Sequence, residues 1–362
     1  MTKNKEKTVP EIGQTQLELL ERLCNATAVS GDEGEVRRIV LEAIQPIVDV
    51  VKVDALGNVL ATKRGHGENR VRVMLAAHMD EIGFMIVDNK DDLFQFERVG
   101  GIDERQLPGK AVLVGKDHLP GVIGAKPIHL TTAKERKSKI EHSSMRIDLG
   151  PGIGDKVKPG DRATFATRFQ LMGPSIRAKA LDDRFGVATL IELLKHAPDN
   201  IDLLAAFTVQ EEVGLRGARV AAYHFNPDMA IAIDSTPAYD LPHWEEDFGN
   251  HHYNTKLDEG PAIYVMDRAT IADQRLVTLL EETAQENDIP YQLRQPGGGG
   301  TDAGAIHKVR SGIPSISVSV PGRYAHTAAS IARVSDWENT LKLLHAALSK
   351  VTPDLLKGER RG

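Results

Sequence analysis

The fold is decided by the stretch Arg70-Val-Arg-Val-Met-Leu-Ala-Ala77, which runs directly into His78-Met79-Asp80. A short, mostly apolar run of this kind predicts a strand that is buried on both of its faces. Because alternate residues at a strand end point the same way, Asp80 can accept the imidazole N–H of His78 and fix the tautomer that presents the other nitrogen to a metal. For this triplet alone, a capping aspartate beside a satisfied histidine is an equally good explanation.

The segment before this strand predicts two helices and a hairpin. Apolar residues at helical spacing precede Ser30-Gly31-Asp32, which breaks the pattern and can cap the second helix. Val50 to Asp54 and Asn58 to Thr62 flank a turn and predict two paired strands. The helices therefore come before the sheet.

The composition changes between about Asp88 and Met172, where Gly and Pro become frequent and the predicted strands are short. Three such strands are Ala111 to Val114, Gly121 to Ala125 and Arg162 to Phe169, separated by turn residues. This pattern predicts a small β-barrel or sandwich inserted into a larger domain.

Strands and helices alternate again after the insert. The predicted helices cover residues 183–196, 214–223, 271–287 and 336–348, and the predicted strands cover 201–209, 229–233 and 315–320. Such alternation predicts an α/β fold, with a mixed or parallel sheet and helices on both faces. We expect residues 1–87 and 173–362 to form the main domain, with residues 88–172 inserted as a β-rich domain.

Composition limits the kinds of partner. The 362 residues, of which 41% are hydrophobic and 27% charged, are more than one hydrophobic core usually supports. A formal charge of -6 gives no electrostatic reason to expect nucleic acid or an anionic membrane as a partner. The lone Cys24 cannot form an internal disulfide, and we expect it to be a buried small apolar residue. The polar start and the lack of an apolar run of about 18 residues predict a cytoplasmic protein that acts on small or peptide substrates.

The pair Asp182-Asp183 opens a predicted helix. An N-terminal cap with favourable dipole interaction explains one aspartate well and the second less well. Alternatively, one carboxylate bridges two cations through its two oxygens, while its neighbour orients a ligand or pairs with Arg184.

The pair Glu211-Glu212 follows an apolar strand and precedes Val213-Gly214. Ionised carboxylates at the end of a buried strand are costly without cations, so positive charge is expected nearby. Because successive side chains diverge, one glutamate can bind a metal while the other faces the substrate. A metal-bound water needs such a base to deliver hydroxide to a carbonyl.

Asp234 and His326 also follow predicted strands, although a turn-forming aspartate is an even alternative at position 234. All of the candidates fall at strand ends or in loops that lead into helices, where open α/β sheets place their sites. Carboxylate and imidazole without nearby thiolate favour zinc, cobalt or manganese. The sequence therefore predicts a metallohydrolase with two adjacent divalent metals.

Two further segments have less specific signals. Gly297 to Gly300 is not followed by Lys-Ser/Thr, so close approach of the backbone near the active site is favoured over phosphate binding. The segment that holds His243, Trp244, His251 and His252 either edges the cleft or belongs to a surface loop.

Five segments of the chain carry a family resemblance: Ala77–Phe84, Ala180–Arg184, Gln210–Ala218, Gly298–Ala305 and Arg323–His326. In order and spacing they resemble the motifs of the M42 metallopeptidases. These are the glutamyl, leucyl and deblocking aminopeptidases, and some have been labelled endoglucanases of the CelM type.

The resemblance implies a ligand set for two metals. Asp182 would bridge both ions, His78 and Asp234 would complete the ligands of one, and Glu212 and His326 those of the other. Zinc or cobalt is the expected metal, and manganese also fits these donors.

The resemblance also implies the remaining roles in the site. Glu211 would be the general base, and Asp80 would support His78 from behind. A cis peptide would join Asp182 to Asp183.

By the same resemblance, the chain would release N-terminal amino acids from peptides by attack of a metal-bound hydroxide. The insert would be a dimerisation domain, and dimers would assemble into a tetrahedral dodecamer. A β-glucan hydrolase is the rival enzyme, but its two carboxylates must face each other across a sugar, which adjacent glutamates cannot do. The third possible function is that of a non-catalytic assembly protein. The sequence leaves open the preferred N-terminal residue and the native metal.

Overall fold

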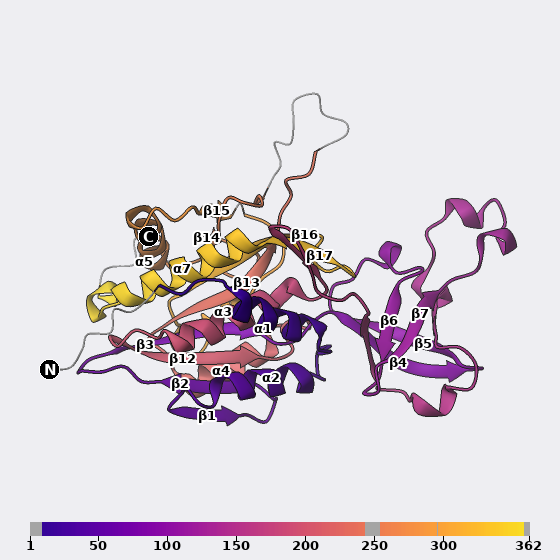
Figure 1. Ribbon diagram of the computed structural model, residues 1–362, viewed down its shortest axis with the longest axis horizontal. Coiled ribbons are helices and arrows are strands. Elements are labelled where there is room, and N and C mark those ends of the chain that lie inside the picture. The colour runs from indigo at the N-terminus through magenta and orange to yellow at the C-terminus, as the bar shows by residue number, and fades with distance from the viewer. Residues whose placement is uncertain (1–8, 243–253, 295, 358–362) are drawn as a thin grey trace.

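The computed structural model describes residues 9–242, 254–294 and 296–357, which form a large α/β unit with a β-barrel beside it (Figure 1). The main path of the sheet runs in the order β1 (Val50–Val53), β2 (Val59–Lys63), β12 (Ile201–Thr208), β3 (Val71–His78), β13 (Met229–Pro237), β16 (Ser315–Arg323), β17 (Ser330–Arg333), β11 (Ser175–Ala178) and β10 (Gln170–Met172). Two short strands, β14 (Ala262–Tyr264) and β15 (Gln292–Arg294), join through β16.

The sheet is mixed, as the sequence predicts. The four central strands β12, β3, β13 and β16 are parallel to one another, whereas β2 pairs with β12 and with β1 in the antiparallel sense. The carboxyl ends of the four parallel strands therefore meet at one edge of the sheet.

Helices cover both faces because β3 is apolar on both. Val73 and Leu75 pack in one core cluster, whereas Met74 and Ala76, which alternate with them, pack in another. The first cluster draws on α1 (Gln14–Asn25), α2 (Gly34–Ile44), α3 (Leu181–Lys195), α5 (Gln274–Glu286) and α7 (Val334–Lys350). The second cluster draws on α4 (Arg216–Phe225) and α6 (Ala303–Ile306).

The barrel has its own core and closes in the order β4 (Gly83–Lys90), β5 (Leu93–Val99), β8 (Arg146–Asp148), β7 (Leu119–Gly124), β6 (Ala111–Val114) and β9 (Arg162–Phe165). Inside it, the ring of Phe84 makes edge-to-face contacts with Phe96 and Phe165 at centroid distances of 5.1 and 5.3 Å. The barrel strands thus begin before residue 88, and β10, which lies within 88–172, pairs with the large sheet.

Single-turn 3-10 helices complete the secondary structure. They are η1 (Glu104–Gln106), η2 (Ile128–Leu130), η3 (Glu135–Lys137), η4 (His142–Ser144), η5 (Gly154–Lys156) and η6 (Pro353–Leu356). None of the helices in the described part of the chain has the length and apolarity needed to cross a membrane.

The predicted cap of the second helix is wrong. Helix α2 begins at Gly34 after Glu33, which makes no side-chain cap. Ser30 instead donates its hydroxyl to Asp80 at 2.6 Å, because a fully buried carboxylate needs donors more than a helix end near solvent does. Cys24 is fully buried as predicted, and burial raises the pKa of its thiol to about 12.

Candidate metal centre

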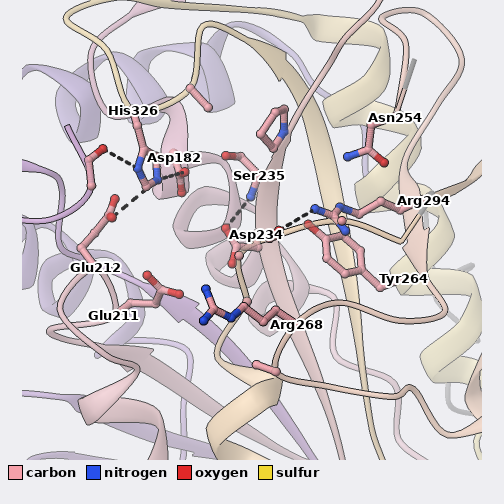
Figure 2. A pocket seen from close by; sticks show the side chains of 18 of the residues that line it. Asp182, Glu211, Glu212, Asp234, Ser235, Asn254, Tyr264, Arg268, Arg294 and His326 are labelled. Carbon is pink, nitrogen blue, oxygen red and sulfur yellow. Dashed lines mark hydrogen bonds and ion pairs between the residues drawn. The ribbon is translucent and has the colours of Figure 1, made fainter. Parts of the chain in front are cut away.

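The cleft lies where the parallel strands end, and it encloses about 1040 Å³. His78 is the last residue of β3, Asp234 lies in β13, and Glu211 and Glu212 follow β12. Figure 2 shows the side chains of Asp182, Glu211, Glu212, Asp234 and His326 in the cleft. Of the seven predicted side chains, six lie in the lining of one cleft, namely His78, Asp182, Glu211, Glu212, Asp234 and His326. The seventh, Asp80, is buried behind them.

Asp182 lies between the two histidines. Its Oδ1 is 3.1 Å from Nε2 of His78, and its Oδ2 is 3.4 Å from Nε2 of His326. A cis peptide joins it to Asp183, as the resemblance implied. Each oxygen of this carboxylate therefore faces a different group of nitrogen and oxygen donors.

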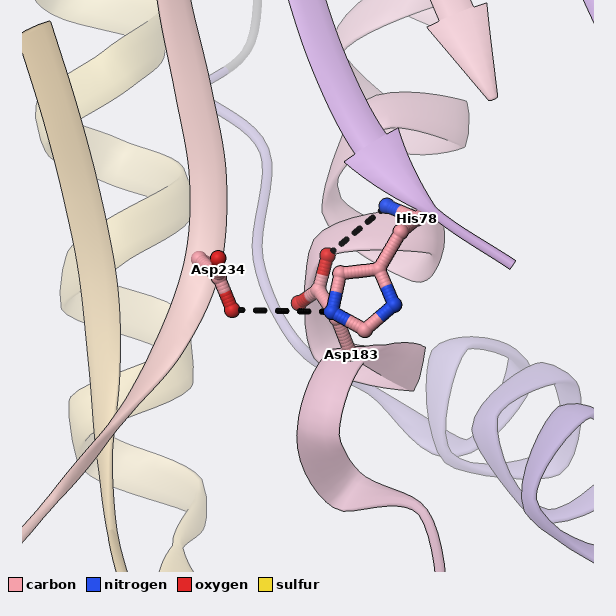
Figure 3. A group of neighbouring side chains, drawn as sticks. All are labelled: His78, Asp183 and Asp234. Atoms are coloured by element: carbon pink, nitrogen blue, oxygen red, sulfur yellow. Dashed lines mark hydrogen bonds and ion pairs between the residues drawn. The ribbon is translucent and has the colours of Figure 1, made fainter. Parts of the chain in front are cut away.

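The first group of donors is His78, Asp183 and Asp234, whose candidate ligand atoms all lie within 4.8 Å of one another. Figure 3 shows Asp234 facing the imidazole, with its Oδ1 3.8 Å from Nε2 of His78. Both oxygens of Asp183 already accept backbone N–H groups, from His78 at 3.2 Å and from Gly186 at 2.8 Å. Asp183 thus fixes the backbone beneath the first group.

Of the two roles that the sequence left open for the neighbour of the bridging aspartate, the pairing of Asp183 with Arg184 is not formed. The guanidinium of Arg184 is fully buried and donates to the carbonyl oxygen of Leu23 and to the carboxylate of Glu81 instead. Asp183 is satisfied by backbone donors, so the arginine is free to pair elsewhere.

The second group is Asp182, Glu212 and His326, again with candidate ligand atoms within 4.8 Å. Oε2 of Glu212 is 3.5 Å from Nε2 of His326. The other ring nitrogen of His326 lies 2.9 Å from the carbonyl oxygen of Gly101, which follows β5 in the barrel. Donation from Nδ1 to this carbonyl leaves Nε2 available to a metal.

Asp80 is fully buried behind these groups and connects them. Its carboxylate accepts the backbone N–H of Glu211 at 3.0 Å and that of Glu212 at 3.2 Å. Nδ1 of His78 is 3.5 Å from the carboxylate and 3.1 Å from the carbonyl oxygen of Asp80 itself, which is the closer acceptor. One residue thus orients the imidazole and holds the loop of both glutamates.

The electrostatics of the cluster suit a divalent cation. Burial and neighbouring carboxylates raise the pKa of Glu212 to about 8 and that of Asp234 to about 6, and they raise the pKa of Glu211 well above its usual range. Burial opposes charge on His326, but Asp182 and Glu212 outweigh it and raise its pKa to about 10. Nitrogen and oxygen donors at this spacing, with carboxylates that repel one another, fit a site for divalent metals.

Sequence reasoning missed two residues beside the cluster. Asp302 is buried, accepts the hydroxyl of Thr208 at 2.5 Å, and has a pKa that burial raises to about 7. Asp302 lies in the segment Gly298–Ala305 that carries the family resemblance, although the sequence assigned it no role. Gly101 carries no local pattern that points to the site, because it reaches His326 through a tertiary contact.

Gly297 to Gly300 line the cleft, in agreement with the predicted close approach of the backbone near the site. Asn254, Tyr264, Arg268 and Arg294 also line the cleft (Figure 2). The residues His243, Trp244, His251 and His252 lie outside the described part of the chain.

The sequence matches the family model of the M42 glutamyl aminopeptidases over residues 57–343. A protein of Acetivibrio thermocellus that is named as a predicted aminopeptidase is 39% identical, and the match covers 92% of this chain and 99% of that protein. Lysyl aminopeptidase of Pyrococcus furiosus is 32% identical over 93% of this chain and 97% of its own length. Glutamyl aminopeptidase of Lactococcus lactis is 31% identical, and the match covers 92% of this chain and 96% of that protein.

The solved structures similar to this chain include an aminopeptidase, a TET1 peptidase and a protein titled an endoglucanase. An aminopeptidase from Desulfurococcus kamchatkensis superposes with a TM-score of 0.88 at 34% identity, covering 95% of this chain and 97% of that one. The TET1 peptidase of Pyrococcus horikoshii can assemble into a tetrahedron or a large octahedral shell. It superposes with a TM-score of 0.80 at 35% identity, covering 93% of this chain and 100% of that one. A protein of Thermotoga maritima titled an endoglucanase superposes with a TM-score of 0.75 at 32% identity, covering 93% of this chain and 98% of that one.

Proposed function

The chain belongs to the M42 family of metal-dependent aminopeptidases, and on that premise we propose how its own residues carry out the release of N-terminal amino acids from peptides. The observation that carries the proposal is the position of Asp182, whose two oxygens face one histidine each. This is the arrangement that a carboxylate shared by two cations requires.

We assign the ligands of two divalent ions accordingly. Asp182 would be shared, His78 and Asp234 would hold one ion, and Glu212 and His326 would hold the other, with zinc or cobalt as the expected metal. When bound, such ions polarise a carbonyl and lower the pKa of water. Asp80 would keep His78 in the tautomer that presents Nε2, and Gly101 would do the same for His326.

Glu211 is the proposed general base. Its side chain lines the cleft, while its backbone N–H is held by Asp80. Burial, Asp234 and Asp302 raise the pKa of its carboxyl, so it can accept a proton from the attacking water and then donate it to the leaving amine nitrogen. The adjacent Glu212 is directed at His326 instead, so the two glutamates have separate tasks.

The substitution Glu211→Gln tests this assignment. We expect turnover of aminoacyl-p-nitroanilides to fall about 10²- to 10⁴-fold, because the amide cannot take the proton, while bound metal stays unchanged. Glu68→Gln, at an exposed loop position, is the matched control and should leave turnover intact. Near-native turnover of Glu211→Gln with its metals bound would place the base elsewhere.

The endoglucanase title of one similar structure keeps β-glucan hydrolysis as a rival. Glycosidases use two carboxylates on opposite sides of the sugar, usually about 5 to 10 Å apart, and no transition metal. In this cleft three of the four lining carboxylates, those of Asp182, Glu212 and Asp234, belong to the two donor groups that contain His78 and His326. The fourth carboxylate is that of Glu211, which is adjacent to Glu212 in the chain. Hydrolysis of β-glucan that survives chelation would favour the rival.

We also propose that the barrel is a dimerisation domain and that dimers assemble further, up to a tetrahedral dodecamer. The similar TET1 peptidase assembles into closed shells. In support, the segment between β7 and β8 carries large apolar side chains in water: Ile128 is 72% exposed and Leu130 61%. Apolar surface of this kind is typical of a contact between proteins.

A further inference from the structure

The charged side chains of the cleft are divided by sign. Every carboxylate in its described lining belongs to the metal centre: Asp182, Glu211, Glu212 and Asp234. The other charged side chains in that lining, histidines aside, are Arg268, Arg294 and Lys308, all cationic. Beyond the centre, the charged side chains of the described lining, histidines aside, therefore all attract an anionic group of a substrate.

Arg294 is already engaged within the wall. Its side chain is buried, donates to the hydroxyl of Thr236 at 3.1 Å and to the carbonyl of Gly298 at 3.3 Å, and lies 4.4 Å from the centroid of the Tyr264 ring. An arginine held in this way shapes the wall more than it reaches for a ligand.

Arg268 is different. Its side chain is exposed, and within the described part of the chain its guanidinium makes no hydrogen bond and no ion pair. In Figure 2 it points toward the same part of the cleft as Glu211. The guanidinium thus keeps all of its donors for something that enters the cleft.

The turn that carries Arg268 is held firmly. The carboxylate of Asp267 accepts the backbone N–H of Ala269 at 2.7 Å and that of Thr270 at 2.6 Å, and the backbone N–H of Arg268 donates to Gly299 at 3.2 Å. Such a turn directs the side chain of its exposed residue consistently.

Two glycines let this turn sit so close to the cleft. A Cβ added at Gly300 would lie 2.9 Å from Cβ of Ala269, and one added at Gly304 would lie 2.5 Å from it. The glycine-rich segment therefore has a steric task, because it provides the space in which the turn rests.

We propose that Arg268 binds a carboxylate group of the peptide substrate. The planar guanidinium donates two parallel hydrogen bonds to a carboxylate, a geometry that no neutral side chain of similar size can match. The inference rests on the aminopeptidase function proposed above. The carboxylate belongs either to an acidic side chain on the N-terminal residue or to the C-terminus of a short peptide. Family membership does not decide between them, since similar proteins are named lysyl and glutamyl aminopeptidases.

The first arm of the test compares glutamyl- and glutaminyl-p-nitroanilide, which differ in one charge and lack a C-terminal carboxylate. The second arm compares the dipeptide Leu-Leu with its C-terminal amide. In one of the two arms we expect cobalt- or zinc-loaded enzyme to have a kcat/KM about tenfold higher for the substrate with the carboxylate than for its amide counterpart. A hydrogen bond between charged groups is worth about tenfold in binding. Arg268→Ala should bring that ratio close to one, and Arg268→Glu should invert it.

The control is Arg219→Glu, which makes the same charge change at an exposed position on α4 outside the cleft and should leave every ratio unchanged. Calorimetry supplies a readout that does not depend on turnover: free glutamate, or Leu-Leu for the second arm, should bind the wild type more tightly than Arg268→Ala.

The proposal is overturned if the wild type shows no preference in either arm, or if Arg268→Ala lowers activity on all substrates equally. If the metal-loaded wild type hydrolysed none of these substrates, the result would instead contradict the proposed aminopeptidase function. In that case the calorimetric comparison still decides whether Arg268 binds a carboxylate.

Discussion

The carboxylate of Asp183 can occupy its position only because residue 186 has no side chain. A Cβ added at Gly186 would lie 2.3 and 2.5 Å from the two oxygens of Asp183. Those oxygens hold the backbone of His78 and the start of α3. A small change in the helix is therefore transmitted directly to a proposed metal ligand.

We predict that Gly186→Ala lowers the free energy of unfolding by about 2 kcal/mol, because the displaced carboxylate leaves a buried N–H of His78 without its acceptor. Metal affinity should fall as well. Urea denaturation and a competition assay with a chelating dye measure the two effects. Gly34→Ala is the control, since it lies at the first turn of α2 with its nearest neighbour 3.8 Å away. Equal stability of the two variants would contradict the prediction.

The sequence was sufficient for the side chains that end strands. Because parallel strands finish at one edge of the sheet, the sequence predicts that His78, Glu212 and Asp234 lie together. Asp234 was expected to follow its strand, but β13 continues past it to Pro237. The sequence could not reveal that Asp80 accepts the N–H groups of both glutamates, because the bond to Glu211 spans 131 residues of chain. Contacts of that kind depend on how distant segments pack.

Between elements, the barrel is joined to α2 by a hydrogen bond from a turn to a helix. Nε2 of His118, between β6 and β7, is 2.6 Å from Oε1 of Glu35, while the other carboxylate oxygen accepts the N–H of Thr27 at 2.9 Å. Burial raises the pKa of Glu35, but the donors from Thr27 and His118 outweigh it and hold the pKa below its ordinary value of 4.5.

We predict that this contact contributes about 1 kcal/mol at neutral pH. Because the folded pKa of Glu35 is lowered, the contribution is present in full above about pH 4.5 and is lost as the pH falls through the folded pKa. Glu35→Gln should thus be less stable than the wild type at pH 7, with a smaller difference in acid. Thermal unfolding from about pH 2 to about pH 8 measures this. Glu42→Gln, which removes an exposed ion pair with Arg22, should change little at any pH.

Elements with strong patterns were predicted and weak ones were not. Strand β3 and the β1–β2 hairpin have clear apolar and turn signals. Strand β8 has only three residues and β17 only four, and each exists because a neighbouring strand offers it hydrogen bonds. Strands this short cannot be recognised from local sequence.

At the scale of the whole molecule, two units share the proposed metal centre, so removing metal should affect the entire chain. We predict that chelation lowers the melting temperature by several degrees and that zinc or cobalt restores it, because ligands that bind only the folded state stabilise it. Differential scanning calorimetry with and without metal measures the shift. An unchanged melting temperature would contradict the assigned centre.

Assembly is tested at the same scale. If the barrel mediates dimers that build a closed shell, light scattering at micromolar concentration should give a mass several times the 39.6 kDa of one chain. A monomer under these conditions would count against the proposed assembly but would leave the ligand assignment untouched.

The contact between Gly101 and His326 limits how the protein can be recombined. A chimera that receives its barrel from a relative would fold both modules and yet lose activity if the graft moved that carbonyl or added a side chain at Gly101, where a Cβ would come within 3.1 Å of the imidazole. The boundary for such an exchange must therefore leave the glycine pair at 100–101 with the recipient.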